Sequence, residues 1–169
     1  MIVSIIFAAM AEELQVAVGG KQKMYETLVS QVEALIWGEQ NLIANLANVS
    51  AAIHMTFKHL WVGFYLLDET HLVLGPFQGP IACTRIIKGK GVCGSVWETQ
   101  QAIIVKNVNE FSGHIACSSD SVSEIVLPLF DKENNFFGVL DIDSTTEGMF
   151  DEMDQNYLMQ ISHLITKSL

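Results

Sequence analysis

Residues 123–144 read SEIVLPLFDKENNFFGVLDIDS, and this stretch restricts the fold more than any other part of the sequence. Two apolar runs, Ser123 to Phe130 and Phe136 to Ile142, have the length and composition of β-strands. The residues between them, Asp131 to Asn135, favour turns. The stretch therefore predicts two adjacent antiparallel strands joined by a tight turn.

Three more strand-like runs lie nearer the N-terminus, at residues 61–67, 71–77 and 102–105. The first two are separated by Asp68-Glu69-Thr70, which predicts a second hairpin. Together the five runs predict an antiparallel β-sheet.

Segments with helical periodicity lie before and after these strands. Apolar residues recur at helical spacing from Lys21 to about Thr56, with Gly38 marking a break between two helices, and again from Phe150 to Leu169. We therefore expect a single α+β domain, in which an antiparallel sheet is flanked by N-terminal helices and a C-terminal helix.

The composition fits one globular domain, because half of the 169 residues are hydrophobic and 17% are charged. Nine basic residues against nineteen acidic ones give a net charge of -10, and no basic cluster is present. Nucleic acid and anionic membranes are therefore excluded as expected partners.

Residues 1–20 are expected to form an N-terminal extension to a domain at residues 21–169. The apolar run Ile2 to Ala9 is shorter than the ~20 residues that span a bilayer. No basic residue precedes Lys21, so the run lacks the positive region of a secretory signal. Met10 is an alternative start. Together with the odd number of cysteines, this pattern predicts a reducing, cytoplasmic location.

Three cysteines, Cys83, Cys93 and Cys117, lie in segments punctuated by glycine. Cys117 lies in a polar run, Gly113 to Ser121, that is typical of a loop. We interpret residues 88–94 as a flexible link that leads into a short helix around 95–99 and could bring Cys83 or Cys93 to Cys117. The pattern favours thiol redox chemistry, with buried inert thiols as the alternative.

Three carboxylates, Glu124, Asp141 and Asp143, lie on the predicted strands of the opening hairpin. Asp141 and Asp143 are two residues apart, so they face the same side of the sheet. Crowded carboxylates repel one another, which raises the pKa of at least one and leaves it a proton. These carboxylates suit the binding of a cationic or zwitterionic small molecule. The alternative is that they form the solvated face of an edge strand.

Two aromatic residues, Trp61 and Tyr65, alternate with Gly63 on the first predicted strand and point to one side. They suit a pocket wall or an ordinary core equally well. His114 beside Cys117 is either an acid or a structural histidine. No histidine or cysteine spacing fits a zinc site, so neither a metal nor a cofactor is expected.

With these segments in place, the chain from about Lys21 to the C-terminus resembles the free methionine-R-sulfoxide reductases, small single-domain proteins with the GAF fold. Seven motifs carry the resemblance in order: Trp61-Val62-Gly63-Phe64-Tyr65, Leu74-Gly75-Pro76-Phe77-Gln78-Gly79, Ala82-Cys83-Thr84-Arg85-Ile86, Gly89-Lys90-Gly91-Val92-Cys93-Gly94, Gly113-His114-Ile115-Ala116-Cys117, Ser123-Glu124-Ile125-Val126 and Val139-Leu140-Asp141-Ile142-Asp143-Ser144.

The resemblance implies a thiol mechanism for reducing free L-methionine-(R)-S-oxide. In it Cys117 is the catalytic nucleophile, Cys83 the first resolving thiol and Cys93 an auxiliary resolving or recycling thiol. Thioredoxin is the implied reductant, and relatives of this family are often homodimers. The sequence departs from the family pattern at Asn107, Asn109, Ser112 and Ser118.

The resemblance also implies how substrate is held. Glu124, Asp141 and Asp143 would bind its amino group and polarise the sulfoxide, and Asp143 is also counted as catalytic. Backbone amides near Ile115 and Ala116 would receive the substrate carboxylate, a role that suits loop N–H groups. The aromatic pair at 61 and 65 would wall the pocket.

Two other function classes stay open. GAF domains are commonly ligand-binding or redox-sensing modules without catalysis. A cysteine-dependent peroxidase would need the same nucleophile, but it would not need three carboxylates for an ammonium group.

Overall fold

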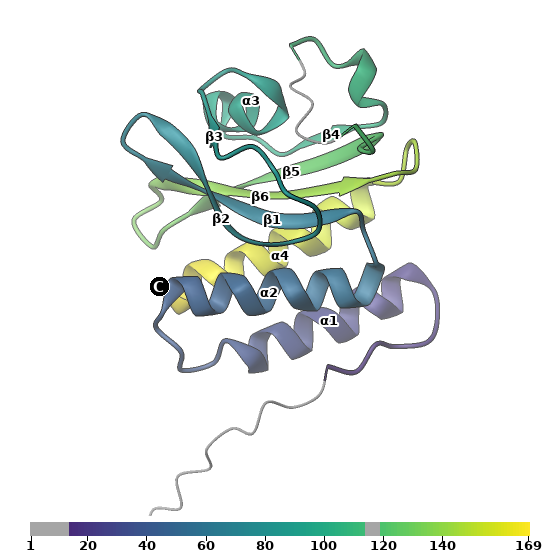
Figure 1. Cartoon of the computed structure of the whole chain (residues 1–169). Coiled ribbons are helices and arrows are strands. Elements are labelled where there is room, and N and C mark those ends of the chain that lie inside the picture. The colour runs from purple at the N-terminus through teal and green to yellow at the C-terminus, as the bar shows by residue number, and fades with distance from the viewer. Residues whose placement is uncertain (1–13, 114–118) are drawn as a thin grey trace, which may run out of the picture.

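The computed structural model describes residues 14–113 and 119–169, which form one layered α+β unit (Figure 1). Its elements, in chain order, are α1 (Lys21–Leu35), α2 (Leu42–Phe57), β1 (Trp61–Asp68), β2 (His71–Gln78), β3 (Arg85–Ile86), α3 (Gly91–Thr99), β4 (Ile103–Val105), η1 (Val108–Glu110), β5 (Ser123–Phe130), β6 (Phe136–Ser144) and α4 (Glu152–Ser168).

The sheet has six antiparallel strands in the order β3-β2-β1-β6-β5-β4. The long strands β1, β6 and β5 form its centre. Helices α1, α2 and α4 cover one face, whereas α3 and the segments around β3 and β4 lie over the other (Figure 1). The α+β fold predicted from the sequence is confirmed.

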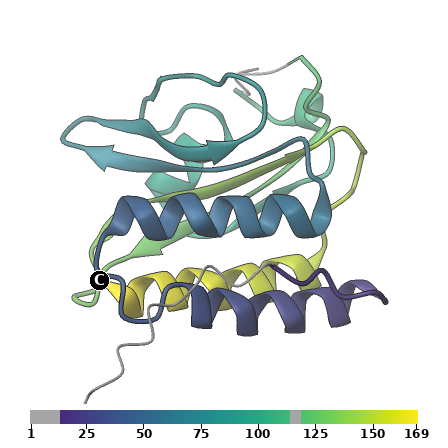
Figure 2. The same ribbon diagram turned by 60° about the horizontal axis from the view of Figure 1, so that its bottom comes forward.

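Helices α2 and α4 contact the sheet directly, and α1 packs against both of them (Figure 2). Tyr25 of α1 is fully buried and donates a hydrogen bond from Oη to Oδ1 of Asp154, at 2.8 Å. Asp151 caps the first turn of α4 by accepting hydrogen bonds from the N–H groups of Met153 and Asp154. No described helix is long and apolar enough to cross a membrane.

The opposite face of the sheet carries a second apolar cluster that includes Trp61, Tyr65, Val96 and Val126. Helix α3 closes over this cluster. The central strands are therefore buried on both faces, which explains why β5 reads as a nearly continuous apolar run rather than an alternating one.

One local expectation was wrong. Residues 91–94 do not belong to a flexible link, because α3 begins at Gly91 rather than near Ser95. Gly94 allows this arrangement: a Cβ at that position would lie 2.4 Å from the carbonyl oxygen of Ile87. Cys93 is consequently a buried helical residue instead of a mobile one.

Candidate active site

Strand register brings the acidic residues together on the face covered by α3. Glu124 of β5 pairs with Asp143 of β6, and Asp143 in turn pairs with Trp61 of β1. Asp141 lies two residues before Asp143 in β6, opposite Gly63. Because residues two apart on a strand share a face, these side chains meet in one place.

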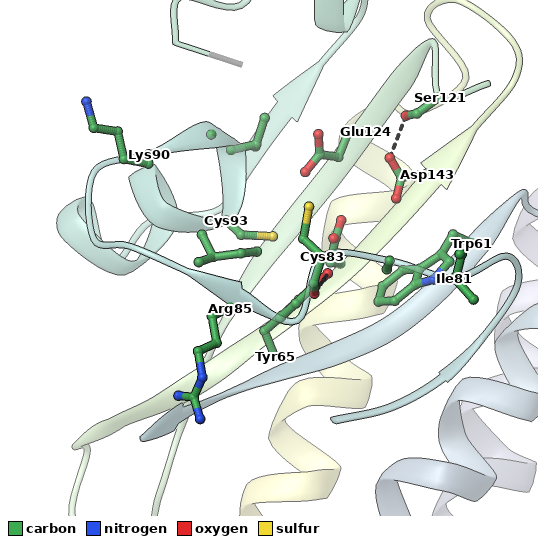
Figure 3. Close-up of a pocket in the computed structure, with 15 residues that line it drawn as sticks. Trp61, Tyr65, Ile81, Cys83, Arg85, Lys90, Cys93, Ser121, Glu124 and Asp143 are labelled. Atoms are coloured by element: carbon green, nitrogen blue, oxygen red, sulfur yellow. Dashed lines mark hydrogen bonds between the residues drawn. The ribbon is translucent and has the colours of Figure 1, made fainter. Parts of the chain in front are cut away.

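A pocket with a volume of about 70 Å³ opens at this place, between the sheet, α3 and the segment around Cys83 (Figure 3). This volume is well below the roughly 300–1,000 Å³ of sites for drug-sized ligands, so the pocket suits a compact group. Its lining residues are Trp61, Tyr65, Ile81, Ala82, Cys83, Arg85, Ile86, Lys90, Gly91, Val92, Cys93, Ser121, Glu124, Asp141 and Asp143.

Two of the three carboxyl groups in this pocket are held away from water, whereas Asp143 is half-buried. Glu124 and Asp141 are each only 6% exposed. Burial, followed by the charge of Asp141, raises the pKa of Glu124 well above its ordinary value, and burial and the charge of Asp143 do the same for Asp141. This pair therefore holds a proton to a higher pH than ordinary carboxyl groups do.

The third carboxyl group, that of Asp143, ionises more readily. Burial raises its pKa to about 6, and a hydrogen bond donated by the Ser121 hydroxyl acts in the opposite direction. The pocket thus combines a carboxylate that is mostly ionised near neutral pH with a neighbouring pair that holds a proton more strongly. This combination allows both cation binding and proton donation.

Cys93 lies against the same carboxylates. Its thiol hydrogen-bonds Asp141, which also hydrogen-bonds Glu124. Burial, together with the charge of Asp141 and then of Glu124, raises the pKa of the Cys93 thiol well above its ordinary value. A thiol in this environment is a weak nucleophile because little of it is thiolate.

Trp61 and Tyr65 form one wall of the pocket and fix the segment that carries Cys83. Trp61 donates from Nε1 to the carbonyl of Pro80 at 3.1 Å, and Tyr65 donates from Oη to the carbonyl of Cys83 at 3.0 Å. The two rings stack, with centroids 5.8 Å apart. Both aromatic residues therefore serve the pocket and the core cluster at once.

Most of the residues singled out in the sequence lie in this one pocket: Trp61, Tyr65, Cys83, Cys93, Glu124, Asp141 and Asp143. Cys117, Ile115, Ala116 and His114 lie outside the described residues.

Sequence reasoning missed Ser121 as a partner of Asp143, although its place in a polar run just before β5 was a usable signal. It also missed Arg85 and Lys90, whose charged ends extend away from the carboxylates (Figure 3).

Known proteins support a family assignment. The GAF domain family model matches residues 47–169. The free methionine-R-sulfoxide reductase of Escherichia coli is 47% identical, over 88% of this chain and 90% of its own. GAF domain-containing protein A of Dictyostelium discoideum is 57% identical, over 92% and 99%.

A solved structure agrees with these relatives. The free methionine-R-sulfoxide reductase of Neisseria meningitidis, solved in complex with its substrate, superposes with a TM-score of 0.89 at 43% identity, over 92% of this chain and 94% of its own. This chain therefore belongs to the free methionine-R-sulfoxide reductases, a family of oxidoreductases built on a GAF domain.

Proposed function

We propose that the chain reduces free L-methionine-(R)-S-oxide to L-methionine, with Cys117 as the nucleophile. The observation that carries the proposal is the meeting of three carboxylates and two cysteines in one compact pocket, on a chain similar to enzymes named for this reaction. A free amino acid offers an ammonium group to the carboxylates, whereas a methionine sulfoxide inside a peptide does not.

In the first step the thiol of Cys117 attacks the sulfoxide sulfur. The oxygen passes to the cysteine, which becomes a sulfenic acid, and the sulfoxide becomes the thioether of methionine. A second cysteine thiol then condenses with the sulfenic acid, forming a disulfide and releasing water. A dithiol such as that of thioredoxin reduces the disulfide and is itself oxidised.

The carboxylates divide the remaining work. The protonated pair Glu124 and Asp141 supplies the proton that turns the sulfoxide oxygen into a leaving group, as a positioned acid does. Asp143 is mostly ionised near neutral pH and lies beside that pair, so it attracts the substrate ammonium and keeps the pKa of the pair high.

Of the two resolving candidates, the surroundings favour Cys83. Cys93 is 4% exposed, sits within α3 and has a raised pKa, all of which slow attack on a sulfenic acid. Cys83 lines the pocket from a segment outside helix and strand. We assign Cys93 an auxiliary role. The backbone amides near Ile115 and Ala116 would bind the substrate carboxylate.

Several further parts of the proposal rest on the sequence and on the family resemblance. Residues 21–169 form the catalytic GAF domain and residues 1–20 an extension to it. Thioredoxin is the reductant, the compartment is the reducing cytoplasm, and the assembly is a homodimer.

The experiment that tests the function is chromatographic measurement of methionine formed from four substrates: the free R and S sulfoxides, an N-acetylated R sulfoxide and a peptide-bound R sulfoxide. Thioredoxin, its reductase and NADPH recycle the enzyme. We expect product from the free R form alone, because only this substrate presents both the correct stereochemistry and an ammonium group.

The matched control is Cys117→Ser, which replaces sulfur with oxygen and little else. It should form no methionine, even in a single turnover of fully reduced protein. Turnover by that variant would rule out the mechanism. Absence of any reduction by the unmodified protein would instead favour a GAF sensor that detects ligands or oxidants.

A further inference from the structure

One group of side chains in the pocket has the composition of a metal site. Cys93 from α3, Glu124 from β5 and Asp141 from β6 each offer one ligand atom, and these atoms all lie within 4.8 Å of one another. Their exposed fractions are 4%, 6% and 6%. Within residues 14–113 and 119–169, no other such group of three is found.

We propose that the reduced protein binds a borderline-soft divalent metal ion, of which Zn²⁺ is the prime example, through Cys93, Glu124 and Asp141. One thiolate with two carboxylates is a donor set that Zn²⁺ accepts, whereas Mg²⁺ and Ca²⁺ prefer oxygen ligands alone. The spacing of these residues along the chain gives no hint of the site, because three separate elements contribute one ligand each.

A second observation points to a cation at this position. Oδ1 of Asp141 is completely buried and has no hydrogen-bond partner among the described residues. An unpartnered buried carboxylate oxygen is costly, and coordination to a cation would satisfy it. The side-chain hydrogen bonds of Asp141 are with Cys93 and Glu124, which are the two remaining ligands, and the charge of Asp143 also acts on it.

The spacing of the three groups also fits. Tetrahedral Zn²⁺ with Zn–O near 2.1 Å and Zn–S near 2.3 Å places its ligand atoms roughly 3.4–3.8 Å apart. The separations here lie within 4.8 Å, so rotamer adjustments smaller than a bond length suffice. All three residues are on helix or strand, which keeps the geometry constant.

Charge balance favours the dication. The three groups carry up to three negative charges when ionised, and binding Zn²⁺ releases the protons that they otherwise retain. Three protein ligands would leave one coordination position for water or another small ligand, and all three residues line the pocket. The site is thus open, as in zinc sites that exchange a ligand, and not closed as in structural zinc sites.

The consequence for activity rests on the proposed function. Glu124 and Asp141 would be occupied by the metal, so they could neither donate a proton nor help to hold an ammonium group. Zn²⁺ would therefore inhibit in competition with methionine sulfoxide, and the inhibition would be reversed by a chelator.

The test uses Co²⁺ as a spectroscopic probe on the full-length protein, reduced with a phosphine and freed of reductant without oxygen. We expect one Co²⁺ per chain and a thiolate-to-cobalt charge-transfer band that Zn²⁺ removes and excess Mg²⁺ does not. Cys93→Ser should abolish the band. Glu124→Gln and Asp141→Asn should each weaken binding by at least about tenfold.

Three matched controls keep the test specific. Cys83→Ser, Cys117→Ser and the exposed Glu147→Gln should each retain the band, and circular dichroism should show that every variant is folded. The proposal is overturned if the unmodified protein gives no charge-transfer band, or if the band persists in a folded Cys93→Ser protein.

This readout is independent of catalysis. Suppose that the metal-free protein reduces no sulfoxide, but that the protein with added Co²⁺ shows the Cys93-dependent band. The metal site is then supported and the proposed reaction is refuted. If the enzyme is active but shows no band, the reaction stands and the metal site falls.

Discussion

Glu124 and Asp143 are register partners on the adjacent strands β5 and β6, and both carboxyl groups line the same pocket. Two ionised carboxylates directly opposite each other would destabilise the sheet, so this pairing favours a proton on one of them. It makes the charge of Asp143 one of the causes, after burial and Asp141, of the raised pKa of Glu124. The two residues therefore titrate as parts of one system.

Replacing Asp143 with Asn should slow the proton-dependent chemical step. Loss of its charge lowers the pKa of Glu124 and Asp141, so less of the pair holds a proton at a given pH. We expect activity to fall as pH rises, because the pair loses its proton. In the variant this fall should begin at a lower pH. We expect a rate roughly tenfold or more below that of the unmodified enzyme at neutral pH. Single-turnover rates from about pH 5 to about pH 9 measure both effects.

The control for this prediction is Glu147→Gln, which removes one exposed negative charge from the same chain. The activity of this variant should fall over the same pH range as that of the unmodified enzyme. If the activity of Asp143→Asn also falls over the same pH range as that of the unmodified enzyme, Asp143 does not set the protonation of Glu124 and Asp141.

Asp143→Asn should also stabilise the fold at neutral pH. The pKa of Asp143 is about 6 in the folded protein against 3.8 ordinarily, so its contribution to stability is complete below about pH 4 and is lost as pH rises through 6. Asparagine does not titrate.

The free energy of unfolding of Asp143→Asn, relative to the unmodified protein, should therefore rise from about pH 4.5 to about pH 7.5, by roughly 1–3 kcal/mol. Urea unfolding of both proteins in a chelator at each pH measures it. A difference that is independent of pH would contradict the assignment of this pKa.

Much of the architecture was readable because periodicity reports local structure. The run Ser123 to Phe130 matches β5 residue for residue, and Phe136 to Ile142 falls short of the end of β6 by two residues. The short strand β3 escaped detection, since Arg85 and Ile86 are too few to show a period.

Contacts between helices and strands were harder to predict from the sequence. The two-residue spacing of Asp141 and Asp143 indicates a shared face, but only the register between β5 and β6 places Glu124 beside them. Cys93 was misread because glycines around it suggested a flexible link. Tertiary packing against Ile87 is what needs Gly94, and that contact leaves no local pattern.

Gly63 should not tolerate a side chain. A Cβ at this position would lie 2.3 Å from Cη2 of Trp61 and 2.4 Å from Cβ of Phe77. Gly63→Ala must displace the Trp61 ring, so we expect a loss of about 1–3 kcal/mol in stability and a raised KM for the sulfoxide. Chemical unfolding and steady-state kinetics measure the two effects.

Gly20→Ala serves as its control, because a Cβ at Gly20 would meet nothing within 4 Å. It should leave KM unchanged and cost less than about 1 kcal/mol, the effect of a weaker helix cap. An unchanged KM in Gly63→Ala would mean that the position of Trp61 does not matter for substrate.

Cys93 should react slowly with alkylating agents in the folded, reduced and metal-free protein. Its thiol is 4% exposed, and burial with the charges of Asp141 and Glu124 raises its pKa, so the reactive thiolate is scarce. We expect iodoacetamide to label Cys93 at least about tenfold more slowly than in the urea-unfolded chain, as measured by peptide mass spectrometry.

Asp141→Asn provides a test of the cause. It removes the neighbouring charge that contributes most, after burial, to the raised pKa, so Cys93 should become more reactive although it stays buried. Glu147→Gln removes an exposed charge elsewhere and should not change the rate. Equal rates in the folded and unfolded protein would show that Cys93 is an accessible thiol, and would restore it as a candidate for resolving the sulfenic acid.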